Sequence, residues 1–305
     1  VPMNIKYDDI LVLEVPGLAE KRPSVIVGDL IDIRVHDDLT AYRGIVKCVN
    51  DKTIDISYVD DELVNYIKQD PNMLLDVAFT LNRLTFERMH EAVDKVACNM
   101  LAALFPNHVD THGLSQRNFR NIDFYNKNIT NNPEQKDAVI KIVNNAQISP
   151  YIVFGPPGTG KTITIVEAIL QIKESTTKRI LVCAPANSAC DNIAIMLLPH
   201  CTKSELLRIH SDTRETSTLT EELKKYSNME VEGIFTKMSV DEIMKFRIVV
   251  TTLMLIGRYR NYKCDCVFID EAAQASEPET NIALGLLTAG GQLILAGDPK
   301  QLGPM

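Results

Sequence analysis

The first 80 residues alternate hydrophobic and polar positions in short runs. The runs DILVLEV, SVIVGDLIDIRV, YRGIVKCV and TIDISYV are separated by Pro, Gly, Asn and Asp, which favour turns. A period of two predicts strands that bury one face, and short strands at this spacing are typical of a small antiparallel barrel. We therefore predict an N-terminal β-barrel domain over residues 1–81.

A helical pattern replaces this alternation at about Asn82. The stretch NRLTFERMHEAVDKVACNMLAALFP spaces its hydrophobic residues as one face of a helix does, and Pro106 ends it. The polar residues 107–132 show no strong period, which indicates a connection. Residues 82–130 are thus expected to form a helical stalk and a connection to a further domain.

From about residue 131, hydrophobic runs alternate with helical patterns. The expected strands are YIVF, RILVCAPA, LLRI, RIVVTT, CDCVFIDEA and QLILAGDP. Strands that are hydrophobic throughout and alternate with helices indicate a parallel sheet covered on both faces. Residues 131–305 are therefore predicted to be an α/β domain, with the charged stretch His210 to Phe246 as a surface excursion.

Composition narrows the class of protein. Runs such as Tyr151 to Phe154 are far shorter than the ~20 residues needed to span a bilayer. The seven cysteines lack the paired spacing of zinc sites, so we expect reduced, structural thiols. No secretory pattern opens the chain, and an intracellular location is expected. The net charge of −8 does not favour a nucleic-acid partner, but it does not report a local groove either.

The strongest chemical signal is GPPGTGKT, which lies between an expected strand and an expected helix. Glycines let backbone N–H groups close around phosphates, and the following helix adds its positive end. Lys161 is expected to reach the β- and γ-phosphates of ATP, and Thr162 to place its hydroxyl on Mg²⁺. The predicted phosphate loop comprises Gly155, Pro156, Pro157, Gly158, Thr159, Gly160, Lys161 and Thr162.

Two further strands deliver polar residues at their carboxyl ends, where open parallel sheets bind ligands. VFIDEAAQ supplies Asp270, suited to hold Mg²⁺, and Glu271, suited to orient and deprotonate the attacking water. QLILAGDPKQL supplies Gln301, whose amide could sense the γ-phosphate. By itself the acid pair would be read as two solvated loop carboxylates, and Gly-Asp-Pro as a turn; the phosphate loop upstream favours the catalytic interpretation.

Together, GPPGTGKT, DEAAQ and GDPKQLGP resemble motifs I, II and III of superfamily 1 RNA helicases of the Upf1-like group. EVPGLAEKRPSVIVGD, FERMHEAV and DEAAQASEPET most resemble the Armitage and Mov10-like branch, known for small-RNA silencing. The resemblance covers essentially the whole chain. It implies a RecA-like P-loop sheet preceded by a small β-barrel on a helical stalk.

The resemblance also implies roles for individual residues. Gln135, in NPEQ, matches the Q motif that contacts adenine, although a Gln is also common at a helix start. Gln274 resembles the residue that links the ATP site to the RNA side. The stretches APANSACDN and VTTLMLIG resemble motifs Ia and Ic, which lie along the nucleic-acid backbone; without the family they would be a strand-to-helix turn and a strand end. The implied strand contacts are Pro185, Asn187, Ser188, Thr251 and Thr252.

The expected function is that of an ATP- and Mg²⁺-dependent 5′ to 3′ RNA helicase or translocase in piRNA or siRNA silencing. The resemblance implies a second RecA-like lobe with catalytic arginines, which the 305 residues lack, so this chain alone is expected to be nearly inactive. Expected partners are single-stranded RNA and Argonaute or Piwi proteins, with a monomer in the cytoplasm or in ribonucleoprotein granules and no membrane insertion. A superfamily 1 DNA helicase and a nucleotide-gated scaffold remain as alternatives.

Overall fold

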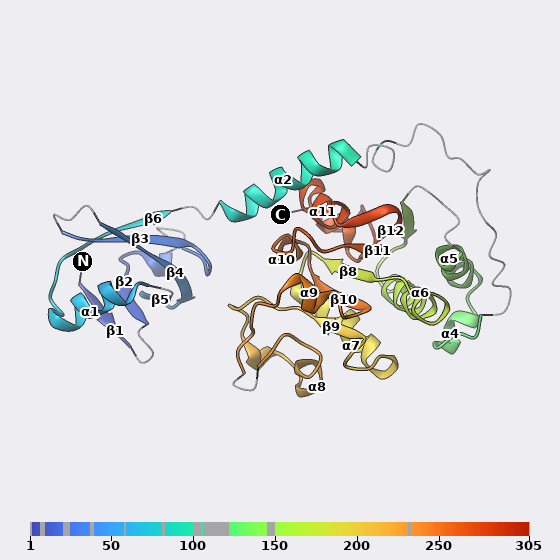
Figure 1. The fold of residues 1–305 in the computed structure, drawn as a ribbon, viewed down its shortest axis with the longest axis horizontal. Helices are drawn as coiled ribbons and strands as arrows, with labels where there is room; N and C mark the ends of the chain where they lie inside the picture. Colours follow the sequence, from blue (N-terminus) through green and yellow to red (C-terminus); the bar gives the residue numbers. More distant parts are fainter. Residues whose placement is uncertain are drawn as a thin grey trace. The chain divides into compact units, whose positions relative to one another are not determined.

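The structure is a computed structural model that describes residues 2–6, 10–20, 25–36, 40–57, 59–80, 83–99, 105, 122–144, 150–230 and 233–304. The chain divides into two compact units, Val1–Thr85 and Phe86–Met305 (Figure 1). The predicted helix end at Pro106 and most of the predicted polar connection lie outside the described residues. Among the described residues, no helix combines the length and the apolar character needed to cross a bilayer.

The first unit is built on a six-stranded antiparallel sheet in the order β1-β2-β5-β4-β3-β6. In β3 and β5 every second side chain is buried, which places Ile31, Ile33, Ile54 and Ile56 in one core. Gly44 in β4 is required by this packing, because a Cβ atom there would overlap the side chain of Ile56. The strands are β1 (Met3–Ile5), β2 (Leu11–Glu14), β3 (Leu30–Val35), β4 (Ala41–Val49), β5 (Thr53–Ser57) and β6 (Leu75–Thr80).

One helix adds its hydrophobic face to this core. Helix α1 (Asp61–Gln69) begins where the Asp60 carboxylate accepts the Glu62 N–H, so the cap satisfies one of the free donors of the first turn. The buried residues of α1 are Leu63, Val64 and Ile67. The sequence-based prediction of a small antiparallel β domain is confirmed.

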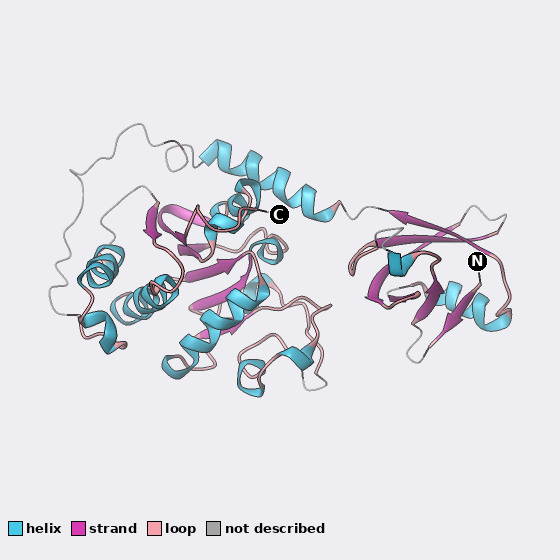
Figure 2. Cartoon of the chain, turned by 180° about the vertical axis from the view of Figure 1, so that it is seen from behind, coloured by secondary structure: helices cyan, strands magenta, loops and turns pink. Residues whose placement is uncertain are grey.

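The second unit is a six-stranded parallel sheet in the order β7-β12-β11-β8-β10-β9. Non-consecutive neighbours mean that the chain crosses over between strands, and helices make the crossings (Figure 2). This confirms the predicted α/β fold class. The strands are β7 (Tyr151–Phe154), β8 (Ile180–Ala184), β9 (Leu206–Arg208), β10 (Ile248–Thr252), β11 (Cys264–Ile269) and β12 (Leu287–Gly297).

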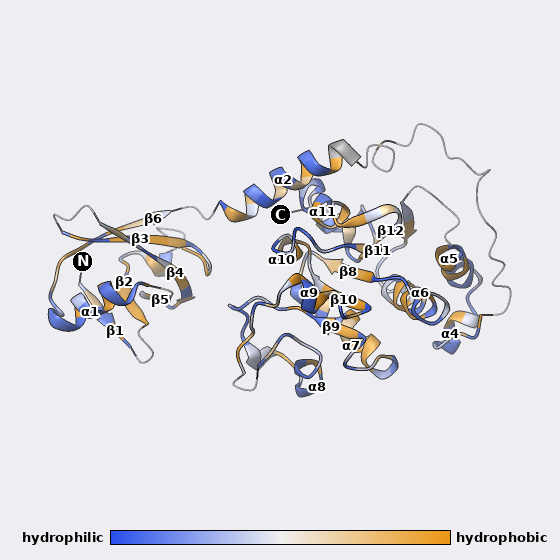
Figure 3. Cartoon of the chain, viewed as in Figure 1, coloured by the Kyte–Doolittle hydropathy of each residue, from blue (hydrophilic) through white to orange (hydrophobic). Residues whose placement is uncertain are grey.

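Helices cover both faces of the parallel sheet. In β8, Ile180 and Val182 pack with α6 and α7 on one face, while Leu181 and Cys183 pack with α2, α10 and α11 on the other. Strands buried on both faces must be hydrophobic throughout, as all five residues of β8 are (Figure 3). The helices are α2 (Leu84–Asn99), α4 (Lys127–Thr130), α5 (Pro133–Val143), α6 (Lys161–Ser175), α7 (Asn187–Leu197), α8 (Glu221–Lys224), α9 (Val240–Ile243), α10 (Leu253–Ile256) and α11 (Glu277–Leu284).

The stretch His210 to Phe246 differs from the predicted surface excursion. Leu223 and Phe235 are buried in the core on one face of the sheet, and Ile243 in the core on the other. His210 is itself only 1% exposed. Most side chains of the stretch are exposed or half-buried, as predicted, but these residues are not. The sequence did not indicate them because isolated apolar residues in a charged segment carry no clear period, although each can fill a place in the core.

Candidate nucleotide site and strand-facing edge

The phosphate loop joins β7 to α6 and is shaped by its glycines. Gly158 and Gly160 have φ values of 78° and 83°, in the left-handed region that residues with a Cβ rarely adopt. Gly160 is also the N-cap of α6, and no side chain caps this helix. The first N–H groups of a 15-residue helix therefore remain available to a phosphate, as the sequence predicted.

Lys161 is held by the loop that surrounds it. Its Nζ donates to the carbonyl oxygen of Gly155 at 2.6 Å and to that of Pro156 at 3.2 Å. Phosphate oxygens are stronger acceptors for an ammonium group than neutral carbonyls, because the bond is then charged on both sides. Lys161 would therefore exchange these two carbonyls for nucleotide oxygens when ATP binds.

Thr162 and Asp270 meet although 108 positions separate them. The Thr162 hydroxyl donates to Asp270 Oδ2 at 2.9 Å, and the Asp270 residue is only 2% exposed. Burial raises the pKa of the Asp270 carboxyl, and the hydrogen bond from Thr162 opposes that shift. A hydroxyl and a carboxylate oxygen are donor types that suit Mg²⁺, so the pair fits the ion that the sequence predicts.

Glu271 has an unusual backbone. Its φ of 51° makes it the one non-glycine residue with positive φ in the described part of the chain. Its N–H donates to Asp270 Oδ1 at 3.0 Å, and its carboxylate accepts from Gln274 Nε2 at 3.3 Å. Such strain is concentrated at functional sites, and nothing in the letters DEAAQ indicated it. Gln274, which the resemblance predicts to link the ATP site to the RNA side, donates directly to the Glu271 carboxylate.

The third polar segment follows β12. Gln301 Nε2 donates to Asp298 Oδ2 at 3.2 Å, and the Lys300 N–H donates to Asp298 Oδ1 at 2.9 Å. The Lys300 N–H holds the pKa of Asp298 below its usual value. Because β12 lies between β7 and β11, Gln301 comes from the strand that separates the phosphate loop from the Asp270 and Glu271 pair.

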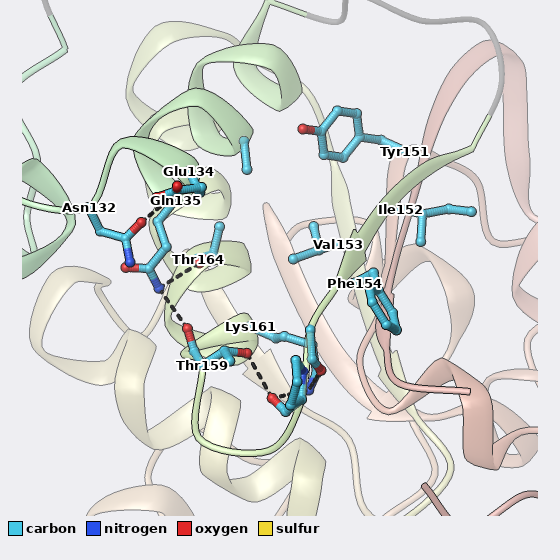
Figure 4. Close-up of a pocket in the computed structure, with 13 residues that line it drawn as sticks. Asn132, Glu134, Gln135, Tyr151, Ile152, Val153, Phe154, Thr159, Lys161 and Thr164 are labelled. Carbon is cyan, nitrogen blue, oxygen red and sulfur yellow. Dashed lines mark hydrogen bonds between the residues drawn. The ribbon is translucent and has the colours of Figure 1, made fainter. Parts of the chain in front are cut away.

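Gln135 lies beside the phosphate loop, at the first turn of α5. Its Nε2 donates to the carbonyl oxygens of Thr159 (3.3 Å) and Gly160 (3.2 Å) and to the Thr164 hydroxyl (3.1 Å). The residue also lines a pocket of about 450 Å³ beside the loop (Figure 4). With its N–H donors bonded to the loop, the Gln135 amide retains its oxygen as an acceptor for a base.

The residues predicted to contact RNA lie at the carboxyl ends of two paired β-strands. β8 and β10 are parallel, with Thr251 opposite Cys183 and Thr252 opposite Ala184. Pro185 and Asn187, which follow β8, are partly exposed, and Ser188 is exposed.

The two threonines differ. Thr252 is partly exposed, but Thr251 is 0% exposed, and its hydroxyl has no hydrogen-bond partner. Successive residues of a strand point to opposite faces of the sheet, so a pair of adjacent threonines cannot present both hydroxyls to the same ligand. In this structure the Thr251 hydroxyl cannot contact an RNA strand bound at the protein surface, contrary to the prediction.

Sequence reasoning missed Arg208 altogether. Its guanidinium is fully buried and donates to Asn187 Oδ1 at 2.9 Å. An arginine at the end of the short run LLRI carries no pattern of its own, and only the fold brings it to Asn187.

Two family models match the chain. A model described as an AAA domain matches residues 130–232 and 213–305, and one described as the β-barrel domain of helicase MOV-10 matches residues 1–79.

Individual relatives match nearly the whole chain. "Putative helicase mov-10-B.1" of Danio rerio is 40% identical over 313 residues, covering 97% of this chain and 30% of the relative. "RNA helicase Mov10l1" of Homo sapiens is 32% identical over 374 residues, covering 97% of this chain and 30% of the relative. "Probable RNA helicase armi" of Drosophila melanogaster is 28% identical over 342 residues, covering 98% and 28%.

The chain thus spans about a third of the length of these relatives. Both units match, the first to the β-barrel domain of helicase MOV-10 and the second to an AAA domain. With the motif residues assembled as described, the chain belongs to the MOV-10-like branch of the superfamily 1 helicases.

Proposed function

We propose that the protein is an ATP-dependent RNA helicase or translocase that remodels RNA or RNA–protein complexes. The observation that carries this proposal is the hydrogen bond between Thr162 and Asp270, because it joins the phosphate loop to the acidic end of β11. Lys161 begins α6 after the loop that follows β7, and Gln301 follows β12, the strand between β7 and β11. These groups fit the charge of a nucleoside triphosphate with its Mg²⁺, which supplies electrostatic stabilisation of the transferred phosphate when bound.

Each residue has a distinct task in this proposal. The loop N–H groups and Lys161 bind the β- and γ-phosphates, while Thr162 and Asp270 hold the ion. Glu271 accepts the proton of the attacking water, and Gln274 orients its carboxylate. Gln301 faces the γ-phosphate and reports its loss. Gln135 offers its amide oxygen to the adenine amino group.

RNA as the substrate is supported by two of the relatives, whose names describe RNA helicases. Asn187, Ser188 and Thr252 offer amide or hydroxyl groups at one sheet edge, of the kind that holds a sugar–phosphate backbone without reading sequence, and Pro185 lies beside them. We propose that hydrolysis moves the strand 5′ to 3′ by opening and closing this domain against a second RecA-like lobe. Arginines from that lobe would raise turnover about 10³–10⁵-fold, so the 305 residues alone should hydrolyse ATP slowly.

The resemblance to the Armitage and Mov10-like branch extends the proposal to the cell. We propose a role in small-RNA silencing with Argonaute or Piwi proteins, in the cytoplasm or in ribonucleoprotein granules, with the protein acting as a monomer. Co-purification of tagged protein with Argonaute-family proteins, tested before and after ribonuclease treatment, examines this part of the proposal.

The central test compares ATP turnover by the intact protein with single-stranded RNA, with DNA of the same sequence and with neither. We expect stimulation by RNA, because contacts to the 2′-hydroxyl distinguish the two strands. Glu271→Gln should lower turnover about 10²–10⁴-fold while ATP still binds. Equal stimulation by DNA would favour a DNA helicase. Wild-type cellular function of Glu271→Gln would favour a nucleotide-gated scaffold instead.

A further inference from the structure

Arg208 ends β9, an edge strand of the parallel sheet, and its side chain is 0% exposed. A buried guanidinium is tolerated only where its donors are bonded. Nε donates to Asp191 Oδ1 at 2.8 Å, Nη1 to the Ile209 carbonyl at 2.7 Å and Nη2 to Asn187 Oδ1 at 2.9 Å. Arg208 thus joins the end of β9 to two residues of α7.

These two residues lie on one face of the helix. Asn187 and Asp191 are four positions apart in α7, so their side chains stand one above the other. The second carboxylate oxygen of Asp191 accepts from Arg214 Nη2 at 2.9 Å. Asp191 Oδ1 lies 2.8 Å from both Nε and Nη2, so it fixes the guanidinium of Arg208 from one side while Nη2 also donates to Asn187 Oδ1.

The bond to Arg208 decides which way the Asn187 amide is turned. A guanidinium has only donors, so the amide atom that faces it must be the oxygen. The Nδ2 group then faces away. Within the part of the chain that the structure describes, Nδ2 of Asn187 has no partner and is not among the buried polar atoms. Asn187 is partly exposed at the first turn of α7, so Nδ2 is not fully enclosed.

This orientation suits one kind of ligand. The oxygens of a phosphodiester only accept hydrogen bonds, so they require the N–H side of an amide rather than its oxygen. An unrestrained asparagine side chain would present either side, because the amide can rotate. The bond to Arg208 removes the orientation that would repel a phosphate and lowers the entropy that binding has to remove.

We propose that Arg208 is a positioning residue for the nucleic-acid strand: it holds the Asn187 amide with both N–H donors toward the bound backbone. Arg208 does not itself touch the strand, since it is buried. The inference rests on the proposed RNA-binding function and adds to it a residue that acts through Asn187.

The test is a double-mutant cycle in the intact protein, read out as the Kd for fluorescein-labelled oligouridylate. Asn187→Ala should weaken binding about tenfold, the typical effect of losing a hydrogen bond to a charged group. Arg208→Met should weaken it by a similar factor. The double variant should bind no more weakly than the weaker single variant, because both changes remove the same contact. The affinity for a fluorescent ATP analogue should not change.

Arg208→Lys is a second variant at this position, which keeps the buried positive charge but not the guanidinium. A lysine cannot bond Asp191, the Ile209 carbonyl and Asn187 at the same time, so we expect it not to restore RNA affinity. Arg247→Met is the matched control. Arg247 also donates to backbone carbonyls, those of Lys173, Thr176 and Lys178, and among the described residues its guanidinium has no hydrogen bond to α7. Its loss should lower stability and leave the RNA Kd unchanged.

Three results would overturn the proposal: losses that multiply in the double variant, an unchanged Kd for Asn187→Ala, or an equal loss of RNA affinity in Arg247→Met. In each case wild-type protein still binds RNA, and the proposed function stands. If wild-type protein binds no RNA in the presence or absence of nucleotide, the proposed function fails, and the role of Arg208 fails with it.

Discussion

At the scale of single residues, two features of the nucleotide site stand out: the close approach of Gly160 to the Gln135 amide, and the opposed pKa shifts of two carboxyls. Gly160 has a φ of 83°, and a Cβ atom there would lie 2.5 Å from Gln135 Nε2. Asp270 and Asp298 end neighbouring strands but have pKa values shifted in opposite directions, the first raised by burial and the second lowered by a backbone N–H group. Each of these features gives a prediction.

Gly160→Ala should impair nucleotide binding beyond its effect on the backbone. Any L-residue in the left-handed region costs about 1–2 kcal/mol, and here the added methyl group must also displace the Gln135 amide from the phosphate loop. Gly290→Ala is the control, because Gly290 has a φ of 73° and nothing within 4 Å of the added atom. Titration with a fluorescent ATP analogue should show weaker binding for Gly160→Ala only. Equal affinities in the two variants would contradict the role given to Gln135.

Asp270→Asn should stabilise the folded protein at pH 7 and abolish ATP turnover. Because the folded-state pKa of Asp270 is raised, its ionised form opposes folding once the pH exceeds the unfolded value, near 3.8. The gain in Tm should therefore be present at neutral pH and disappear as the pH falls through the folded pKa toward that value.

Asp298→Asn should behave in the opposite way. Its lowered pKa means that ionised Asp298 favours folding above the unfolded pKa and loses that effect as the pH falls through the folded value. The variant should have a lower Tm at pH 7 and should approach wild type in acid. A Tm shift of the same sign in both variants would show that the opposed pKa shifts do not set the stability of the two variants.

At the scale of elements, a buried carboxylate connects helix α6 to the chain that leads into α4. Glu167 is 2% exposed and accepts the backbone N–H groups of Tyr125 (3.1 Å) and Asn126 (2.9 Å). Gln171, one turn later, donates to the same carboxylate at 2.9 Å and to the Asp123 carbonyl at 2.7 Å. The helix that begins at the phosphate loop thus also holds the segment that precedes the adenine-side helix α5.

Glu167→Ala should lower the free energy of unfolding by about 1–3 kcal/mol for each N–H group that is left buried without a partner. Glu221→Ala in α8 is the control, since the side chain of Glu221 is 83% exposed and an exposed pair such as the one it makes with Lys224 contributes little to stability. Urea denaturation of both variants measures the difference. A loss of equal size in the two variants would mean that Glu167 does not anchor the segment.

At the scale of the whole molecule, the nucleotide residues all belong to one of the two units. The residues assigned to ATP, of which Gln135 is the first and Gln301 the last, all lie within Phe86–Met305. This unit has its own sheet and two hydrophobic cores. Deleting the first unit should therefore leave the affinity for an ATP analogue unchanged, as measured by fluorescence titration. A large loss of nucleotide affinity, with the parallel sheet still folded by circular dichroism, would show that the barrel takes part in the ATP site.

The amino-acid sequence by itself determined both fold classes and the phosphate loop. Period-two alternation, continuous hydrophobic strands and glycines at fixed spacing are local signals, because burial of one face, burial of two faces and positive φ each impose a residue type at each position. The same reasoning found Asp270, Glu271 and Gln301, since the carboxyl ends of parallel strands meet at one edge.

Only the tertiary structure decided how these residues are bonded. The strain at Glu271, the burial of the Thr251 hydroxyl and the buried side chains between His210 and Phe246 depend on neighbours that are distant in sequence. Arg208 is the clearest case, because its contact with Asn187 exists only where β9 lies beside the start of α7. Hydrophobic periodicity reports which face of an element is buried, whereas the hydrogen-bond partner of a buried polar group is set by packing across the whole domain.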